Sequence, residues 1–346
     1  MYSRTETKPV VITVFRPPGE GRFPLLILNH GRAVEAKRHL QSRQRYTAQA
    51  RWFVRQGFVV MVPTRIGYGE TFGPFDPEYS NSCKNTVLEP KNEALFRQIM
   101  AVHDFAKTQD YVDARHWLIA GQSLGGYTTV TVAGRSPPGL VGAINFAGGF
   151  GGNPETRRGN PCDARAWEKQ LAQPLPGIPV PMMWVYWQDD WYWGDEHPRQ
   201  WFKAFQSGGG KGQLVQLPAL PGDGHAGFTR DLTHWAPVVE NYLQQLPVER
   251  PKVVLKMPSL RPPSSVFARL DEVDKVPYLS ASGREKYQEF IASKSPQRAF
   301  AINVEGRWGW SSGYEDSHDR ALGFCNKNAR SPCALYAIDN DVVWRP

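Results

Sequence analysis

Short apolar runs that alternate with amphipathic helical stretches constrain the fold of this chain, up to about residue 247. The runs lie at 10–14, 25–28, 58–62, 117–120, 140–146, 182–186 and 214–217. Most are too continuously apolar for strands with one face in water, so we expect strands buried on both faces. Helical stretches separate them, near 46–56, 92–108, 123–135, 198–206 and 231–246. This order predicts an α/β fold, a mostly parallel sheet covered by helices on both faces.

Repeated helix breakers follow this alternating pattern, at 247–251 and again at 258–263. The chain has 346 residues, whereas single cores stop growing near ~250–300 residues. We therefore expect an α/β domain over 1–247, a Pro-rich linker over 248–263 and a small α+β module over 264–346. The module is predicted to contain helices near 283–292 and 316–326, strands near 299–304 and 307–311, and a hairpin of 334–338 with 342–344.

The sequence Gly121-Gln122-Ser123-Leu124-Gly125 lies between an apolar run and a helical stretch rich in Gly, Ala and Thr. The order is strand, tight turn, helix. A serine at the tip of such a turn adopts strained backbone angles, which nearby glycines permit, and its Oγ stands clear of the sheet. The setting predicts that Ser123 is a nucleophile, with a glycine-rich connector as the alternative interpretation.

A serine nucleophile needs a base, and the base needs a carboxylate that orients it. Asp189 and Asp190 follow the run at 182–186, and His225 lies in the Gly/Pro-rich loop after the next run. Both loops follow strands, and the chain order is Ser, Asp, His, as in α/β-hydrolases. The spacing from the strand favours Asp190 as the acid, with Asp189 as the alternative.

These positions resemble an α/β-hydrolase of the dienelactone-hydrolase-like group. The matching segments are the turn 29–32, the Ser123 turn, the strand end at 186–190 and Gly224-His225. The resemblance implies serine hydrolysis of carboxylic esters or lactones without a metal or organic cofactor. Dienelactone hydrolases proper carry cysteine as nucleophile, so Ser123 favours an esterase.

Two other functions stay open. One is a serine peptidase or amidase of the prolyl-oligopeptidase-like branch, against which we weigh the lack of a propeller-sized domain. The other is a non-catalytic binding protein on a hydrolase scaffold, with the C-terminal module as its working part.

The oxyanion of an acyl-transfer reaction needs two backbone N–H donors. We expect them to be Leu124, at the start of the helix after the nucleophile, and Arg32. Tyr68 follows an apolar run and is a candidate for substrate contact, as are Trp191 and Trp193, which flank the acid. For these aromatic residues the alternative is packing in the core or a lid.

The four cysteines lie in polar loops, where disulfides fit better than free thiols. We expect Cys83 to pair with Cys162, and Cys325 with Cys333. Such pairs imply a periplasmic or secreted protein, and four reduced surface thiols are the alternative. The start of the sequence lacks a signal peptide's apolar segment, which fits either a cytoplasmic protein or a mature form. No cysteine lies in a CxxC or near a histidine pair, so no zinc site is expected.

The formal net charge is +8, and the basic residues are scattered. The densest stretch, 32–45, lacks interleaved aromatic residues, so we interpret it as a solvated surface and expect no nucleic-acid partner. No apolar window reaches ~18 residues, so no transmembrane helix is expected. The expected partner is a small-molecule or polymer-linked ester. The C-terminal module, with its turn at 306–310, either contacts a cell wall or polysaccharide or, as we favour, only stabilises the hydrolase.

Overall fold

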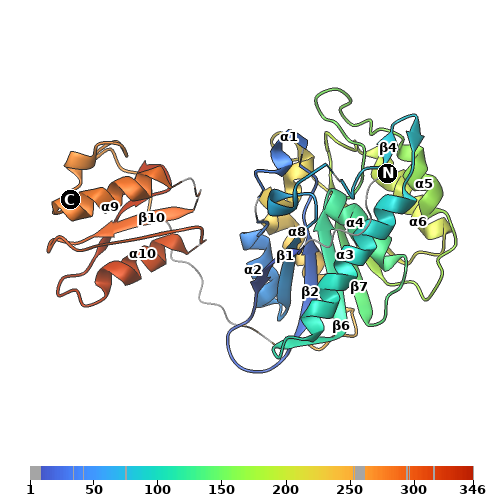
Figure 1. Cartoon of the computed structure of the whole chain (residues 1–346), viewed down its shortest axis with the longest axis horizontal. Helices are drawn as coiled ribbons and strands as arrows, with labels where there is room; N and C mark the ends of the chain where they lie inside the picture. The colour runs from blue at the N-terminus through green and yellow to red at the C-terminus, as the bar shows by residue number, and fades with distance from the viewer. Residues whose placement is uncertain are drawn as a thin grey trace. The chain divides into compact units, whose positions relative to one another are not determined.

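The computed structural model describes residues 9–33, 35–41, 43–74, 76–251, 253, 262–293, 295, 297–314 and 316–345. Its contacts divide the chain into two compact units, Met1–Leu255 and Lys256–Pro346 (Figure 1). Half of the predicted linker, 254–261, lies outside the described residues. Its beginning packs on the first unit, because Arg250 Nη1 donates to the Gln56 carbonyl at 3.2 Å.

The first unit is built on a seven-stranded sheet with the strand order β1-β3-β2-β6-β7-β8-β9. The strands are β1 (Val11–Phe15), β2 (Phe23–Asn29), β3 (Val59–Thr64), β6 (Val112–Gln122), β7 (Leu140–Phe146), β8 (Met182–Trp187) and β9 (Gly212–Leu217). Only β1, at one edge, is antiparallel to its neighbour; the other described pairs are parallel. The prediction of a mostly parallel sheet is confirmed.

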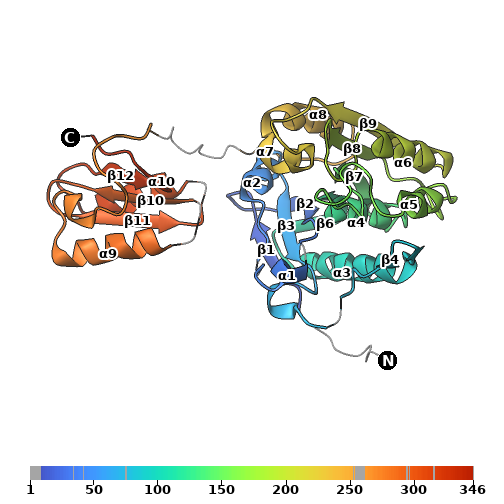
Figure 2. The same ribbon diagram turned by 90° about the horizontal axis from the view of Figure 1, so that it is seen from above.

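Helices cover both faces of this sheet, as predicted. Figure 2 shows α3 (Glu89–Lys107), α4 (Leu124–Ala133), α5 (Ala164–Leu171) and α6 (Glu196–Ser207) on one side, and α2 (Thr47–Arg55) and α8 (Leu232–Gln244) on the other. Two short helices, α1 (Glu35–Arg38) and α7 (Gly227–Arg230), complete the described helices of this unit. Among the described helices none is both long enough and apolar enough to span a membrane.

The central strands contain continuous apolar runs because successive side chains pack in two different cores. In β2, Leu25 and Ile27 pack with the helices α3 to α6, whereas Leu26 and Leu28 pack with α2 and α8. Side chains alternate between the two faces of a strand, so a strand covered on both sides needs an unbroken apolar run. This is why the runs could be recognised in the sequence.

Two loop-rich insertions, 71–90 and 148–173, contain more helix and strand than their composition predicts. The segment 148–173 contains α5, whose buried side chains are Trp167 and Leu171, one helical turn apart. The segment 71–90 contains a small hairpin of β4 (Asn81–Ser82) and β5 (Asn85–Thr86). A helix with only two buried apolar positions among glycines and prolines gives little periodic signal.

The second unit is an antiparallel sheet between two helices. Its strand order is β11-β10-β12-β13, with β10 (Arg298–Ile302), β11 (Trp308–Ser312), β12 (Ala334–Ile338) and β13 (Asp341–Val342). Figure 1 shows α9 (Ala281–Ala292) and α10 (Ser317–Asn326) on opposite faces of this sheet. Along β10, Phe300 and Ile302 pack in the cluster that includes α9, and Ala299 and Ala301 in the cluster that includes α10. The predicted α+β module is present.

Both disulfides join the cysteines that the sequence analysis paired. Cys83 is bonded to Cys162 and so ties the 71–90 insertion to the 148–173 insertion. Cys325 is bonded to Cys333 and fastens the end of α10 to the segment before β12. Each bond therefore closes a loop-rich part of the fold.

We predict that Phe300→Ala lowers the stability of the second unit by about 3–5 kcal/mol, because Phe300 is fully buried against Tyr287 and Phe290. Hydrogen exchange followed by mass spectrometry should show protection lost in peptides of β10 and β12 and kept in β6 and β7. Phe324→Ala, at a side chain that is 58% exposed, is the control and should change little. Equal loss of protection in β6 and β7 would contradict two separately stable units.

Candidate active site

Ser123 lies at the turn between β6 and α4 with backbone angles that L-residues rarely adopt, φ 58° and ψ −122°. Hydrogen bonds hold this strained turn in place. The Ser123 N–H donates to the Phe146 carbonyl at 3.0 Å, and its carbonyl accepts from the Tyr127 and Gly149 N–H groups at 3.0 and 3.3 Å. Backbone strain that is held in place by several hydrogen bonds is typical of a functional position.

The two glycines around Ser123 are required by close packing. A Cβ at Gly121 would lie 2.3 Å from the Gly125 carbonyl oxygen, and one at Gly125 would lie 2.3 Å from the Asn29 carbonyl oxygen. Neither glycine has a positive φ. Their role is thus to let the start of α4 approach the end of β2, which sets the serine turn against the turn that follows β2.

Asp190 and His225 meet at the ends of two neighbouring strands. Asp190 follows β8, and His225 lies in a short 3-10 turn, Gly224–Ala226, after β9. His225 Nδ1 is 3.0 Å from Asp190 Oδ2. The other carboxylate oxygen of Asp190 accepts from the N–H groups of Tyr192 at 2.8 Å and Trp193 at 3.1 Å. Both oxygens of this buried carboxylate are therefore used.

Asp189 points elsewhere. Its half-exposed carboxylate forms an ion pair with Arg158 at 2.8 Å, and that pairing lowers the pKa of Asp189. Its φ of 56° turns the chain so that the next residue, Asp190, enters the interior. Of the two aspartates left open by the sequence, Asp190 is the one in contact with His225.

Aromatic rings and backbone bonds fix the His225 ring. Tyr192 stacks on it with ring centres 4.0 Å apart, and the Trp193 ring meets it edge-on at 5.4 Å. The His225 N–H donates to Asp223 Oδ1 at 2.9 Å, and the His225 carbonyl accepts from Gln122 Nε2 at 3.2 Å. The backbone of His225 is thus tied to Gln122, the residue directly before Ser123.

The turn after β2 lies beside Ser123. A Cβ at Gly31 would lie 2.7 Å from Gln122 Oε1 and 3.2 Å from Ser123 Cβ. The Gly31 N–H donates to the Tyr46 hydroxyl, which in turn donates to Gln122 Oε1, both at 3.2 Å. This turn is the segment that contains Arg32, one of the two expected oxyanion donors.

Arg65, a fully buried side chain at the end of β3, clamps the same turn. Its Nη1 donates to the His30 carbonyl at 2.5 Å and its Nη2 to the Gly31 carbonyl at 3.4 Å. Its backbone N–H donates to His30 Nε2 at 3.1 Å. His30 therefore carries its proton on Nδ1, which donates to the Gly31 carbonyl at 2.7 Å. Burial, assisted by the charge of Arg65, lowers the pKa of His30 well below its ordinary value and keeps it neutral.

Glu78, in the 71–90 insertion, is the counter-ion of Arg65 and Arg32. The buried carboxylate accepts from Arg65 Nε at 2.7 Å, Arg32 Nη1 at 2.9 Å and the Tyr68 hydroxyl at 2.8 Å. Burial alone would raise the pKa of Glu78, but the positive charges of Arg65 and Arg32 outweigh it and lower the pKa. Glu78 is thus an anion that links the insertion to the turn beside Ser123.

A cavity of about 380 Å³ opens above Ser123. Its lining comes from residues 32–33, 78–81, 123–124 and 149–155, together with Lys91, Tyr192 and Trp193. The two disulfide-linked insertions supply most of these residues. Both expected oxyanion donors, Arg32 and Leu124, line it with Ser123.

The aromatic candidates for substrate contact fall in different places. Trp193 lines the cavity. Tyr68 is buried and used by Glu78, and it is not among the lining residues. Trp191 lies outside the cavity lining and packs under the Arg158 guanidinium, 4.0 Å from its ring centre. Of these three aromatic residues, Trp193 is the one that lines the cavity containing Ser123.

Lys91, in the first turn of α3, also faces the cavity, although its side chain is 1% exposed. Its Nζ lies 4.2 Å from the ring centre of Tyr127 and 4.1 Å from that of Phe150. Burial lowers the pKa of Lys91 from 10.5 to about 7, and the negative charge of Glu78 only partly opposes this shift. The ammonium is therefore held at a cost to the fold.

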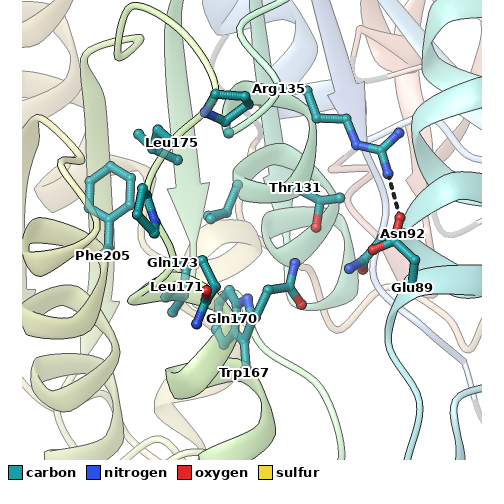
Figure 3. Close-up of a pocket in the computed structure, with 14 residues that line it drawn as sticks. Glu89, Asn92, Thr131, Arg135, Trp167, Gln170, Leu171, Gln173, Leu175 and Phe205 are labelled. Carbon is teal, nitrogen blue, oxygen red and sulfur yellow. Dashed lines mark hydrogen bonds and ion pairs between the residues drawn. The ribbon is translucent and has the colours of Figure 1, made fainter.

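A second, smaller cavity of about 180 Å³ lies among α3, α4, α5 and α6 (Figure 3). Trp167, Leu171 and Phe205 contribute apolar walls, and the ion pair of Arg135 with Glu89 lies at its rim. Its lining does not include Ser123. It is separate from the cavity above the serine.

No group of three or more His, Cys, Asp or Glu side chains is arranged to hold a metal ion in the described part of the chain.

The sheet order, the strained serine turn and the carboxylate–histidine pair at the following strand ends define the first unit as an α/β-hydrolase fold. Residues 44–144 match the Prolyl oligopeptidase family. No curated protein matches the chain in sequence.

Three solved structures illustrate the likeness in fold. A protein from Klebsiella pneumoniae assigned as a dienelactone hydrolase is 17% identical, with a TM-score of 0.46 over 68% of this chain and 90% of that one. Acetyl xylan esterase from Paenibacillus sp. R4 is 16% identical, with a TM-score of 0.47 over 69% and 80%. Acylaminoacyl peptidase from Pyrococcus horikoshii is 12% identical, with a TM-score of 0.45 over 68% of this chain but 38% of its own. Similarity at this level says nothing about the substrate.

Sequence reasoning did not find Arg65, Glu78 or Lys91. Arg65 lies in a segment that was singled out for Tyr68 and carries a cation directly after a buried strand, which is a usable signal. Glu78 and Lys91 lie in an insertion and at a helix start, where charged residues are ordinary.

We predict that Lys91→Met stabilises the protein most at pH 7 and below. Because the folded state lowers the pKa of Lys91 to about 7, its stability deficit is complete below pH 7 and fades as pH rises toward the unfolded value. Urea unfolding at pH 6.5 and 9.5 should give a gain on the order of a few kcal/mol that shrinks at the higher pH. The matched control is Lys107→Met on the same helix, at a side chain 53% exposed. A gain that is equal at both pH values would contradict the buried-charge account.

Proposed function

We propose that the first unit is a serine hydrolase that cleaves carboxylic esters through an acyl-enzyme on Ser123. The observation that carries this proposal is the hydrogen bond between buried Asp190 and His225. The loop of His225 is also bonded to Gln122, in the strained turn whose Ser123 lines a cavity. His225 Nε2 acts as the base toward Ser123 Oγ, and Asp190 holds the imidazole with its proton on Nδ1.

In this mechanism Ser123 Oγ attacks the ester carbonyl while its proton passes to His225. The imidazolium is stabilised by Asp190 and then protonates the departing alcohol. Water, deprotonated by His225, attacks the acyl-enzyme and releases the acid and the free serine. The N–H groups of Tyr192 and Trp193 hold the Asp190 carboxylate in place against the imidazole.

The oxyanion is bound by the N–H groups of Leu124 and Arg32. Leu124 is the first residue of α4, so its N–H has no carbonyl of the preceding helical turn to bond, and the helix dipole adds positive potential there. The N–H of Arg32 and the carbonyl of Gly31 belong to one trans peptide and point in opposite directions. Because Arg65 and His30 hold that carbonyl, they direct the Arg32 N–H away from themselves, toward the serine side.

A peptidase or amidase is the second candidate. The match of residues 44–144 to the Prolyl oligopeptidase family favours it, and the same serine, histidine and aspartate chemistry cleaves amides. Comparing nitrophenyl esters with peptide anilides separates the two.

The disulfides support an oxidising compartment as the site of action, periplasmic or secreted. For the second unit, contact with a cell wall or polysaccharide stays a proposal beside the simpler one that it stabilises the chain.

Replacing the two neighbouring aspartates tests the assignment of the acid. We expect Asp190→Asn to lower kcat for a nitrophenyl ester by about 10³- to 10⁴-fold, because the imidazole loses the carboxylate that fixes its tautomer. Asp189→Asn removes only an exposed ion pair and should change kcat less than about fivefold. Ser123→Ala should abolish both turnover and labelling by a fluorophosphonate, measured by intact mass. Labelling at another residue would refute the proposed nucleophile.

Arg65→Lys tests the clamp on the oxyanion turn. A lysine keeps the charge next to Glu78 but cannot bond both carbonyls of the turn, so we expect kcat to fall about 10- to 100-fold with little change in KM. The control is Arg135→Lys, in a surface ion pair with Glu93, which should leave kcat unchanged. Thermal unfolding of each variant checks that the fold is kept. Unchanged kcat in a folded Arg65→Lys variant would show that the donor is positioned without the clamp.

A further inference from the structure

We infer that Lys91 binds a carboxylate on the acyl part of the substrate, so that the site selects half-esters of dicarboxylic acids over esters of neutral acids. This inference rests on the proposed ester hydrolysis at Ser123 and adds a substrate class to it. Lys91 is then a specificity-determining residue, and it takes no part in the bond-breaking steps.

The first argument is the position of the ammonium. Lys91 lines the same cavity as Ser123, and its side chain is 1% exposed. Within the described residues no carboxylate lies at ion-pair distance from its Nζ; its neighbours are the faces of Tyr127 and Phe150. The cavity that Lys91 lines gives an anion access to it.

The second argument is energetic. Removing an ammonium from water costs several kcal/mol, whereas a cation over an aromatic ring recovers about 0.5–2 kcal/mol. Lys91 also lies in the first turn of α3, where the helix dipole disfavours a cation. An uncompensated cation in such a place indicates that its counter-ion arrives with a ligand.

The third argument is the charge balance around the cavity. Two carboxylates near Lys91 already form ion pairs. Asp76 pairs with Arg32 and Arg38, and Glu78 pairs with Arg32 and Arg65. Glu155 also lines the cavity, so with Lys91 four cations face three carboxylates. An incoming carboxylate meets a net positive environment, and a cationic substrate is repelled.

The fourth argument assigns the carboxylate to the acyl part. His225, which protonates the departing alcohol, lies against Tyr192 and Trp193. Lys91 lies instead against Tyr127 and Phe150, on α4 and after β7. The acyl chain therefore extends toward Lys91 while the alcohol leaves beside His225.

The test compares 4-nitrophenyl half-esters of succinate, glutarate and adipate with the same compounds capped as methyl esters at the far carboxyl. For the native chain we expect kcat/KM to favour the anionic ester by about tenfold or more at one chain length, since hydrogen bonds to charged groups contribute about 1.5–3 kcal/mol. Lys91→Met should remove this preference. Lys91→Arg should keep part of it, and Lys107→Met all of it.

The pH profile of the same ratio separates a charge effect from a packing effect. Below pH 7 the ammonium of Lys91 is present, and the preference for the anionic ester should fall as pH rises through about 7. Glu78, Asp76 and Arg32 are the charged groups that act on it, and Tyr127, whose pKa burial raises, stays neutral. In Lys91→Met the ratio should not depend on pH.

Two different failures are distinguishable. If the capped esters are hydrolysed and no chain length favours the anion, or if Lys91→Met leaves the ratio unchanged, the inference is overturned and the esterase proposal stands. If no ester is hydrolysed, the proposed function fails, and the inference is then decided by calorimetric titration of adipate. Binding that Lys91→Met weakens at least tenfold supports an anion site, and equal or absent binding in both proteins overturns it.

Discussion

The buried guanidinium of Arg65 is the interaction on which the geometry of the site depends. It joins three segments that are far apart in sequence: the end of β3, the turn after β2 and the insertion that carries Glu78. A buried ion pair is weak support for stability, because desolvation consumes most of the attraction. The contribution of Arg65 is to geometry. Its planar guanidinium has donors in fixed directions, so it holds two adjacent carbonyls and sets the orientation of the peptide beside Ser123.

The reacting groups and the substrate pocket have different structural origins. Ser123, Asp190 and His225 lie at the ends of parallel strands, where the sheet itself brings them together. The walls of the cavity come mainly from the two insertions, which the bond of Cys83 to Cys162 ties to each other. The chemistry can therefore stay constant while the insertions set the substrate, which is a usual division of labour between a rigid scaffold and its loops.

This division explains what the sequence could reveal. Strands buried on both faces appear in the sequence as continuous apolar runs, so the sheet could be predicted. Residues that follow such runs meet at one edge of the sheet, which allowed Ser123, Asp190 and His225 to be predicted as neighbours. The choice between Asp189 and Asp190 needed coordinates, because one left-handed residue decides which side chain turns inward. Glu78 and Lys91 gain their roles from contacts with residues distant in sequence, such as Arg32 and Tyr127, and no local spacing predicts such contacts.

Lys91 shows how a cost to stability can be connected to selectivity. A methionine at this position would fill the same space between Tyr127 and Phe150 without a charge to desolvate, so packing alone does not explain a lysine. Because its pKa is about 7, the side chain is close to equal amounts of the neutral and the charged form at neutral pH. A bound carboxylate favours the charged form and raises that pKa, so binding of an anionic substrate is coupled to uptake of a proton. The pocket then discriminates by charge as well as by shape, which the aromatic walls alone could not do.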